Sequence, residues 1–256
     1  MSSDPYHKRP EWSYSQMKKI ISSGIDYAVW QKNEDVGIAC NKAINTGTFV
    51  HQVLLGGEDT FVVAPFKGNY ATNEEGWTTK AKREWRDAQS VAIINDEQFD
   101  GIIHIADRIK SHKFASELLM DDAKHEVELY ATIDGVNIRG KADAVKYHKD
   151  GKIAIVTDLK TTAQFDEFKY RSFRNHYDLQ AAVYTNICGN PDTMNYYFVV
   201  AETVEPYRVQ VMHASMAFLE NGERKLKTCL DEIKGFGTRE VSFNIEEVIE
   251  LGDMSL

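Results

Sequence analysis

The feature that most constrains the fold is a strict alternation of apolar and polar residues over residues 124–133. Val127, Leu129, Ala131 and Ile133 point to one side of this segment, and the polar residues between them point to the other. This period of two is the side-chain pattern of a β-strand. An Asp-Gly pair follows at once, and such pairs form the tight turns of antiparallel hairpins. The sequence therefore predicts a hairpin that begins at this strand.

Two further segments extend the hairpin into a meander. Residues 136–147 are predicted as the second strand. Residues 152–158 contain the run Ile-Ala-Ile-Val and are predicted as a third strand, buried on both faces. Lys-Asp-Gly at residues 149–151 supplies the turn between them. The centre of the chain is therefore expected to be three consecutive antiparallel strands.

The rest of the chain is mostly helical in pattern, with apolar residues at helical spacing. Helices are predicted over residues 13–31, 41–55, 78–94, 96–121, 174–188 and 214–234, strands over residues 59–64, 194–202 and 206–213, and a loop over residues 65–79. No repeat or linker divides the chain. We expect one domain over residues 1–256, with an N-terminal helical part about 10–121, a sheet core about 122–213 and a C-terminal helix about 214–234. Its fold class is then α/β (α+β mixed), a mixed central sheet flanked by helices.

Composition excludes several classes of protein. The content of 43% hydrophobic and 27% charged residues suits one large globular core. Cys40, Cys188 and Cys229 are far apart, which speaks against a disulfide framework or a zinc site. The polar N-terminus and the absence of a long apolar run predict a cytoplasmic protein without contact to a membrane. The net charge of −9 does not favour binding to nucleic acid unless basic residues gather locally.

Three charged residues stand out against the apolar meander. Asp158 and Lys160 are two apart on a strand, so their side chains share a face. If the turn is centred at residues 150–151, Asp143 on the preceding strand falls opposite Asp158, because the two numbers sum to 301. Buried charges are costly unless they are paired or bind a metal. The sequence therefore predicts two facing carboxylates beside a lysine.

Two adjacent carboxylates repel each other unless a cation lies between them, and their oxygen atoms suit Mg²⁺ or Mn²⁺. A lysine beside such a metal would orient or deprotonate a water, or stabilise charge on phosphorus during hydrolysis of a phosphodiester. The alternative is a solvated charge cluster on a hairpin.

Other residues that join this constellation each have an ordinary structural explanation as well. Glu126 and Glu128 lie on the first strand of the meander, and either is able to add a carboxylate. His51 lies on the second predicted helix. Gln180 and Tyr184 are four residues apart, which places them on one face of a helix.

Taken in order, these segments resemble the RecB-like branch of the PD-(D/E)xK nucleases. The resemblance is closest to the exonuclease VIII (RecE-like) C-terminal nuclease domains of phages and prophages, and it covers about residues 13–200. The segments that carry it are Gly47-Thr48-Phe49-Val50-His51, Glu126, Gly140-Lys141-Ala142-Asp143, Asp158-Leu159-Lys160-Thr161 and Gln180-Ala181-Ala182-Val183-Tyr184. Asp-Leu-Lys departs from the Asp-Tyr-Lys that is common in RecB-like proteins.

The resemblance implies a restriction-endonuclease-like core and a role for each residue. Asp143 and Asp158 would bind Mg²⁺, for which Mn²⁺ would substitute, and Lys160 would be the catalytic lysine. His51 would be a metal ligand or a neighbour of one. The resemblance makes Glu126, in preference to Glu128, and the backbone carbonyl of Leu159 further metal ligands. It places Gln180 and Tyr184 at the scissile phosphate.

The resemblance also implies an activity and partners. Such a protein would be a Mg²⁺-dependent exodeoxyribonuclease that resects linear double-stranded DNA 5′→3′, leaving 3′ overhangs for recombination by strand annealing. It would form a homo-oligomeric ring, a trimer or tetramer, and work with a single-strand annealing protein in the cytoplasm of a bacterial host. An endonuclease of the same fold, a non-catalytic DNA-binding or assembly protein and a hydrolase of other phosphate esters remain alternatives.

A ring requires basic residues only along its bore, which would reconcile DNA binding with the acidic net charge. Trp77 and Trp85 flank one basic cluster and would stack on bases or pack in the core. The candidate bore residues are Lys67, Lys80, Lys82, Arg83, Arg86, Arg139, Lys141, Lys169, Arg171 and Arg174.

Overall fold

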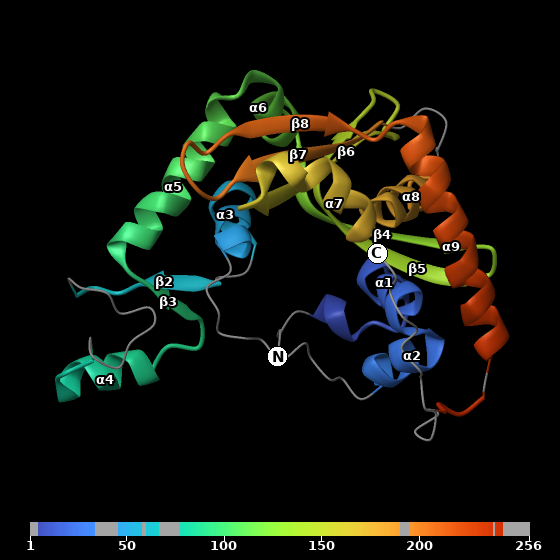
Figure 1. Ribbon diagram of the computed structural model, residues 1–256, viewed down its shortest axis with the longest axis horizontal. Coiled ribbons are helices and arrows are strands. Elements are labelled where there is room, and N and C mark those ends of the chain that lie inside the picture. Colours follow the sequence, from blue (N-terminus) through green and yellow to red (C-terminus); the bar gives the residue numbers. More distant parts are fainter. Residues whose placement is uncertain are drawn as a thin grey trace, which may run out of the picture.

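A six-stranded mixed sheet forms the centre of the protein in a computed structural model (Figure 1). The structure describes residues 5–33, 46–57, 60–66, 77–189, 195–237 and 239–242. The strands run in the order β1-β5-β6-β7-β8, with β4 paired to β5. Their bounds are β1 (Trp12–Ser13), β4 (Lys124–Ile133), β5 (Val136–Tyr147), β6 (Ile153–Thr162), β7 (Asn195–Glu202) and β8 (Val209–His213).

Helices cover both faces of this sheet. One face packs against α3 (Thr46–Leu55), α5 (Asp96–Ser111) and α6 (Lys113–Leu119) through a core that includes Leu159. The other packs against α1 (Tyr14–Ser23), α8 (Tyr177–Ile187) and α9 (Met216–Phe236). The mixed α/β fold with a helix-flanked mixed sheet confirms the predicted fold class.

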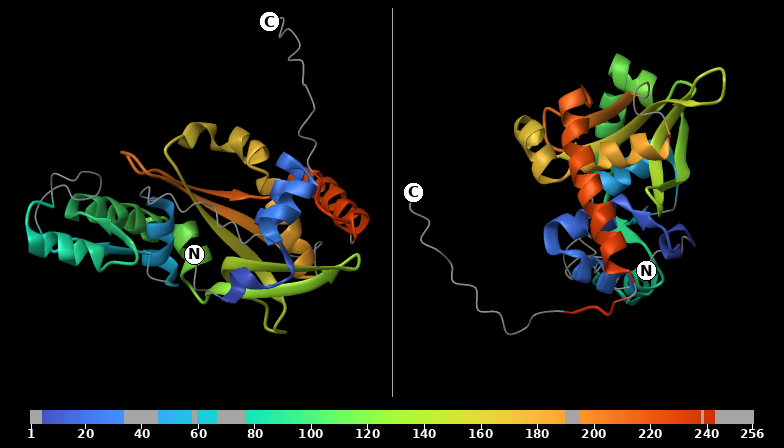
Figure 2. Two further views of the ribbon diagram at one scale, coloured as in Figure 1. Left: turned by 90° about the horizontal axis from the view of Figure 1, so that it is seen from below. Right: turned by 90° about the vertical axis from the view of Figure 1, so that its right-hand side faces the viewer.

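A small appendage lies to one side of the sheet. It consists of the parallel pair β2 (Phe61–Val63) and β3 (Ala92–Ile94) and the helix α4 (Lys80–Asp87). Figure 2 shows this group at one end of the molecule, while α1, α2 (Ile25–Asn33) and α9 gather at the other. Over the described residues, no helix combines a bilayer-spanning length with an apolar sequence.

The predicted strands of the meander match the structure best. β4 and β5 have the predicted bounds, and β6 continues four residues beyond the predicted end at residue 158. This extension places Asp158 and Lys160 inside the strand rather than at its end. The predicted strands 59–64, 194–202 and 206–213 are present as β2, β7 and β8, each shorter than predicted.

Several predicted helices were wrong in extent. The helix over residues 13–31 is two helices, because Gly24 adopts a positive φ of 83° that ends α1. The helix over residues 96–121 is interrupted by His112, whose Nδ1 accepts the Ala115 N–H and begins α6. The helix over residues 174–188 begins at Tyr177, and a separate α7 (Phe168–Arg174) precedes it.

The largest error concerns the segment predicted as helix over residues 78–94. Its last three residues, Ala-Ile-Ile, form β3 and pair with β2. A short apolar run does not distinguish a strand from a helix, and the β-branched isoleucines favour the strand once a partner is present. Residues 41–45, most of the predicted loop at 65–79, Cys40 and Lys67 lie outside the described residues.

A fork in the sheet positions the candidate site. β4 pairs along one edge of β5, from Val136 to Val145. The other edge of β5 pairs with β1 at Ile138–Arg139 and with β6 from Ala144 to Tyr147. Among the described residues, no strand pairs with residues 140–143 on that edge. Side chains from both faces of the sheet therefore have access to this gap.

Candidate metal centre

The predicted register between the second and third meander strands is confirmed. Ala144 faces Thr157 and Val145 faces Val156, so each pair sums to 301. Continued by one residue, this register sets Asp143 opposite Asp158 at the mouth of the fork. The tight turn at residues 149–151 thus brings together two carboxylates that are 15 positions apart in the sequence.

Side chains replace the missing strand pairing inside the fork. The Leu159 N–H donates to Asp143 Oδ2 at 2.7 Å. The Tyr184 hydroxyl donates to the Lys141 carbonyl at 2.7 Å and accepts from the Lys141 N–H at 3.1 Å. Both polar groups of the Lys141 backbone are therefore satisfied without a neighbouring strand, as burial requires. These bonds take the place of strand pairing beside the carboxylates.

The close approach of Tyr184 explains Gly140. A Cβ at residue 140 would lie 2.9 Å from Tyr184 Cε1 and 3.3 Å from Ile187 Cδ1. Only glycine leaves room for the ring to reach the Lys141 backbone. The glycine of the Gly-Lys-Ala-Asp segment is thus required by packing at the fork, in addition to being part of the sequence signature.

Three possible metal ligands meet at the fork. One ligand atom each of His51, Glu126 and Asp143 lies within 4.8 Å of the others. His51 Nδ1 is 3.6 Å from Asp143 Oδ2, and its Nε2 donates to the Leu159 carbonyl oxygen at 2.7 Å. His51 therefore lies between two of the predicted oxygen ligands.

The structure distinguishes the two glutamates that the sequence left open. Glu126 has a positive φ of 52°, and its carboxylate lies 3.0 Å from Lys141 Nζ within the cluster. Glu128 instead accepts a hydrogen bond from the exposed Tyr130 hydroxyl. Only Glu126 is grouped with His51 and Asp143, as the resemblance implied.

Asp158 and Lys160 form a buried ion pair beside this cluster. Lys160 Nζ is 2.6 Å from Asp158 Oδ2, and Gln180 Nε2 donates to Asp158 Oδ1 at 2.5 Å. The ammonium also lies 4.9 Å from the centre of the Tyr177 ring. Gln180 thus orients Asp158 through one oxygen, and the Lys160 ammonium faces the other.

The electrostatics of the site show an excess of negative charge. Burial and the neighbouring Asp158 raise the pKa of Asp143 to about 6. Burial lowers the pKa of Lys160, but Asp158 and Asp143 more than offset this, and the net shift is upward. Two carboxylates and one ammonium leave a surplus carboxylate, which a bound cation would neutralise.

The residues present fit a divalent metal. Carboxylate oxygens and the Leu159 carbonyl are ligands that Mg²⁺ and Mn²⁺ prefer, and a histidine nitrogen is a ligand of divalent transition metals. In addition, the buried Oε1 of Gln180 has no hydrogen-bond partner among the described residues. An unpaired acceptor beside Asp158 suits a polar molecule entering the site.

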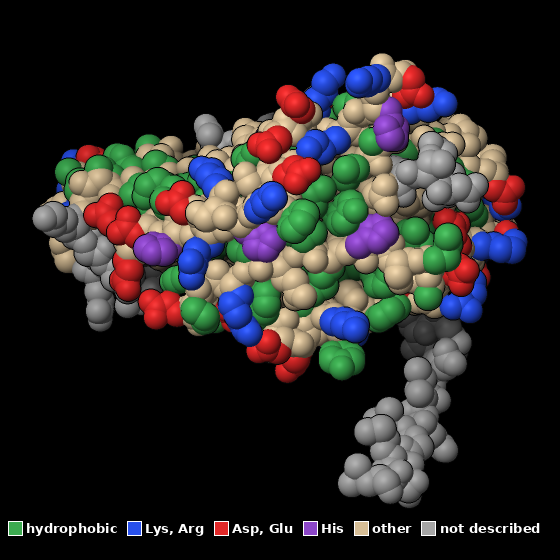
Figure 3. All heavy atoms as spheres, turned by 90° about the horizontal axis from the view of Figure 1, so that it is seen from above, with side chains coloured by type: hydrophobic (Ala, Val, Ile, Leu, Met, Phe, Trp, Pro, Cys, Tyr) green, Lys and Arg blue, Asp and Glu red, His purple; other side chains and the backbone are tan. Residues whose placement is uncertain are grey.

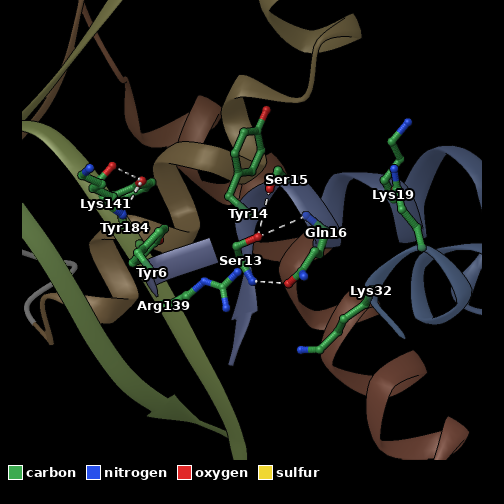
Figure 4. A pocket seen from close by; sticks show the side chains of 12 residues that line it. Tyr6, Ser13, Tyr14, Ser15, Gln16, Lys19, Lys32, Arg139, Lys141 and Tyr184 are labelled. Carbon is green, nitrogen blue, oxygen red and sulfur yellow. Dashed lines mark hydrogen bonds between the residues drawn. The ribbon is translucent and has the colours of Figure 1, made fainter. Parts of the chain in front are cut away.

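A pocket of about 340 Å³ opens from the fork along β5 (Figure 4). Lys141 and Tyr184 line one side of it, Lys19 and Lys32 line the other, and Ser13 lies between them. Of these lysines, Lys141 pairs with Glu126 of the metal cluster, and Lys32 donates to the Glu11 carbonyl at 3.3 Å. Figure 3 shows acidic and basic side chains interspersed on the face seen from above.

The predicted DNA-binding residues are not all gathered at this pocket. Arg139 lines it, but its guanidinium is buried, stacks on Tyr6 and donates to the Glu11 carbonyl at 3.0 Å. Arg171 and Arg174 lie on α7. Lys80 lies on the distant α4 of the appendage (Figure 1).

Sequence reasoning did not identify Tyr6, Ser13, Tyr14 or Tyr177. Tyr14 lines the pocket and its hydroxyl donates to the Asn175 carbonyl at 3.1 Å. Tyr6, Ser13 and Tyr14 come from the N-terminal segment, which β1 ties to β5 through only two paired residues. So short a strand leaves no periodic signal.

Comparisons with known proteins agree with this architecture. Residues 13–244 match a family described as a PDDEXK-like domain of unknown function (DUF3799). No curated protein matches the sequence. A candidate exonuclease from Eubacterium rectale has a similar crystal structure, with a TM-score of 0.59 and 14% identity over 99% of this chain and 96% of that one. A phage-related exonuclease from Haemophilus somnus 129PT aligns with a TM-score of 0.35 and 13% identity over 88% of this chain and 94% of that one.

Proposed function

Since this chain belongs to the PDDEXK-like domain family, we propose that it is a divalent-metal-dependent nuclease. The observation that carries the proposal is the buried Asp158–Lys160 pair facing Asp143, with His51 and Glu126 grouped around the second carboxylate. A structural ion pair has no need of a surplus carboxylate, whereas a metal centre does.

We assign the metal ligands to His51, Asp143, Asp158 and the Leu159 carbonyl, with Glu126 as a further carboxylate. When bound, Mg²⁺ would supply positive charge at the scissile phosphate and lower the pKa of a water. Lys160 contributes a second positive charge at a fixed position, which stabilises charge that develops on the phosphoryl oxygens. Gln180 orients Asp158, and Tyr184 keeps the fork open.

The substrate that the site suits is DNA. Lys19 and Lys141 line a pocket along β5, where the phosphates of a bound strand would contact them. More specifically, we propose a 5′→3′ exonuclease on linear duplex that leaves 3′ overhangs for strand annealing. The name of the Eubacterium rectale structure, a candidate exonuclease, is in line with an exonuclease. Ring formation, an annealing partner and a cytoplasmic location in a bacterial cell belong to the same proposal.

Digestion of linear duplex in Mg²⁺, labelled at either the 5′ or the 3′ end, tests this function. The proposal predicts early release of the 5′ label and late release of the 3′ label, with covalently closed circles left intact. Cleavage of closed circles would instead make the protein an endonuclease. Intact DNA with both Mg²⁺ and Mn²⁺ would leave a non-catalytic DNA-binding or assembly protein.

A further inference from the structure

An exposed aromatic surface lies on α7, the helix between the catalytic strand β6 and α8. Tyr170 is 78% exposed and Phe173 45% exposed, on one face of the helix. The Phe173 ring contacts Phe218 in α9 with centroids 5.0 Å apart, and Met216 in the same turn of α9 is 69% exposed. Exposed apolar side chains that gather in this way mark an interaction surface.

Positive charge accompanies these aromatic side chains. Lys169 and Arg174 are exposed on α7, and neither forms an ion pair with another described residue. Arg171 pairs with Glu167 at 2.8 Å. The acidic side chains nearest in sequence, Asp166 and Glu167, are thus both occupied, the former by Arg208. We call Lys169, Tyr170, Phe173 and Arg174 the α7 platform.

The platform is held rigidly against the sheet. Arg208 donates to both carboxylate oxygens of Asp166, at 2.8 and 3.1 Å, and lies over the Phe165 ring. This fixes the short 3-10 helix (Phe165–Glu167) that precedes α7.

The platform is also close to the candidate catalytic lysine. Phe168, on the buried side of α7, stacks on Tyr177 with centroids 5.7 Å apart. The Tyr177 ring in turn lies 4.9 Å from Lys160 Nζ. A nucleic-acid strand whose scissile phosphate is at Lys160 would therefore have neighbouring nucleotides within reach of α7.

We propose that the α7 platform binds an unpaired DNA strand, with bases stacked on Tyr170 and Phe173 and phosphates held by Lys169 and Arg174. Stacked aromatics interleaved with unpaired cations recognise single-stranded nucleic acid irrespective of sequence. This inference rests on the proposed function, because it assigns the platform to a strand of the same DNA substrate.

The test is binding of a fluorescein-labelled oligothymidylate of roughly 16 nucleotides to the full chain in EDTA, followed by anisotropy. Tyr170→Ala should weaken binding about tenfold, and the double variant with Phe173→Ala more. Tyr170→Trp should retain or improve binding, because it keeps a stacking ring. Lys169→Gln with Arg174→Gln should reduce the dependence of affinity on salt.

Phe114→Ala provides the matched control, because Phe114 is 61% exposed but lies on α6 on the other face of the sheet. It should bind the oligonucleotide as the wild type does. If Phe114→Ala lost as much affinity for the oligonucleotide as Tyr170→Ala, or if Tyr170→Ala kept the wild-type affinity, the proposed role of the α7 platform would be wrong. If Tyr170→Ala altered the oligomeric state in sedimentation while oligonucleotide binding persisted, the surface would be an interface between copies and the inference would fail.

This binding assay is independent of the nuclease assay. A protein that degrades duplex in Mg²⁺ but binds the oligonucleotide equally well with and without Tyr170 rejects the platform alone. If the protein cleaves no DNA, the proposed function is wrong. The affinities of the wild type and of Tyr170→Ala for the oligonucleotide still decide whether the platform binds an unpaired strand.

Discussion

Within the described residues, two buried aspartates each pair with a partly exposed lysine, and the two pairs differ in how their charge is balanced. Asp158 and Lys160 are 2.6 Å apart beside a second carboxylate, Asp143. Asp178 and Lys225 are 2.7 Å apart where α8 meets α9. Asp178 also accepts from the Leu179 N–H and the Asn221 amide. Asp178 and Lys225 balance each other and are hydrogen-bonded. Asp158, Lys160 and Asp143 together carry one surplus negative charge.

The difference separates a functional pair from a structural one. A balanced pair joins two helices and contributes only if both partners are kept. An unbalanced pair costs stability, and this cost is offset when a cation binds. Removing one carboxylate should therefore have opposite effects on stability at the two places, whereas removing either lysine leaves buried negative charge uncompensated.

The largest expected effect is on catalysis. Lys160→Ala should reduce cleavage of linear duplex by about a thousandfold or more, because it removes a fixed positive charge from the scissile phosphate. Circular dichroism should show an unchanged fold. Wild-type turnover in this variant would remove Lys160 from the catalytic site.

The matched change at the other pair should affect stability instead. Lys225→Ala leaves the buried carboxylate of Asp178 uncompensated, which should lower the free energy of unfolding by about 3–5 kcal/mol. Urea unfolding measures this loss. Cleavage per folded molecule should persist at low temperature, and its disappearance would mean that the two pairs are coupled.

Much of this comparison was accessible from the sequence and part of it was not. The alternation of apolar and polar residues and the turn dipeptides are local signals. They predicted β4, β5 and the register that sets Asp143 opposite Asp158. The Asp178–Lys225 pair joins residues 47 positions apart on two helices, and no periodicity encodes such a contact. The same holds for the pairing of β1 with β5 and for the pocket it builds. His51 and Gln180 reach the fork from helices on opposite faces of the sheet. The family resemblance placed both residues at the site but did not predict the faces, and spacing alone predicted neither.

A third prediction concerns pH in the absence of metal. The pKa of Asp143, about 6, lies above its usual value of 3.8, so the charged form is disfavoured in the fold. The folded protein then binds more protons than the unfolded chain between about pH 4 and pH 6, and stability falls as the pH rises through this window. In EDTA, Asp143→Asn should remove this loss and stabilise the protein at pH 7 by up to about 3 kcal/mol.

Thermal unfolding of both proteins at several pH values measures this effect, with Asp178→Asn as the contrasting variant. Asp178→Asn should destabilise, because its carboxylate is fully paired. If both substitutions changed stability in the same direction, the distinction between balanced and unbalanced pairs would be wrong.

The smallest effect is expected at the fork itself. Gly140→Ala introduces a Cβ 2.9 Å from the Tyr184 ring, which should cost about 1–3 kcal/mol by overpacking. Displacement of the Tyr184 hydroxyl from the Lys141 backbone should also slow cleavage. Gly101→Ala on α5 is the control, because nothing lies within 4 Å of its added Cβ. If Gly140→Ala and Gly101→Ala had the same stability and the same cleavage rate, the fork would tolerate a Cβ at residue 140.

Direct measurement of Mn²⁺ binding tests the central claim, that the surplus carboxylate at the fork is there to hold a metal. Calorimetric titration of Mn²⁺ into the wild type, Asp143→Asn and Asp178→Asn at pH 7.5 (well above the Asp143 pKa of about 6) compares the two pairs in one experiment. The account predicts binding to the wild type and to Asp178→Asn, and at least about tenfold weaker binding to Asp143→Asn. Absence of binding to the wild type, or unchanged affinity in Asp143→Asn, would contradict it.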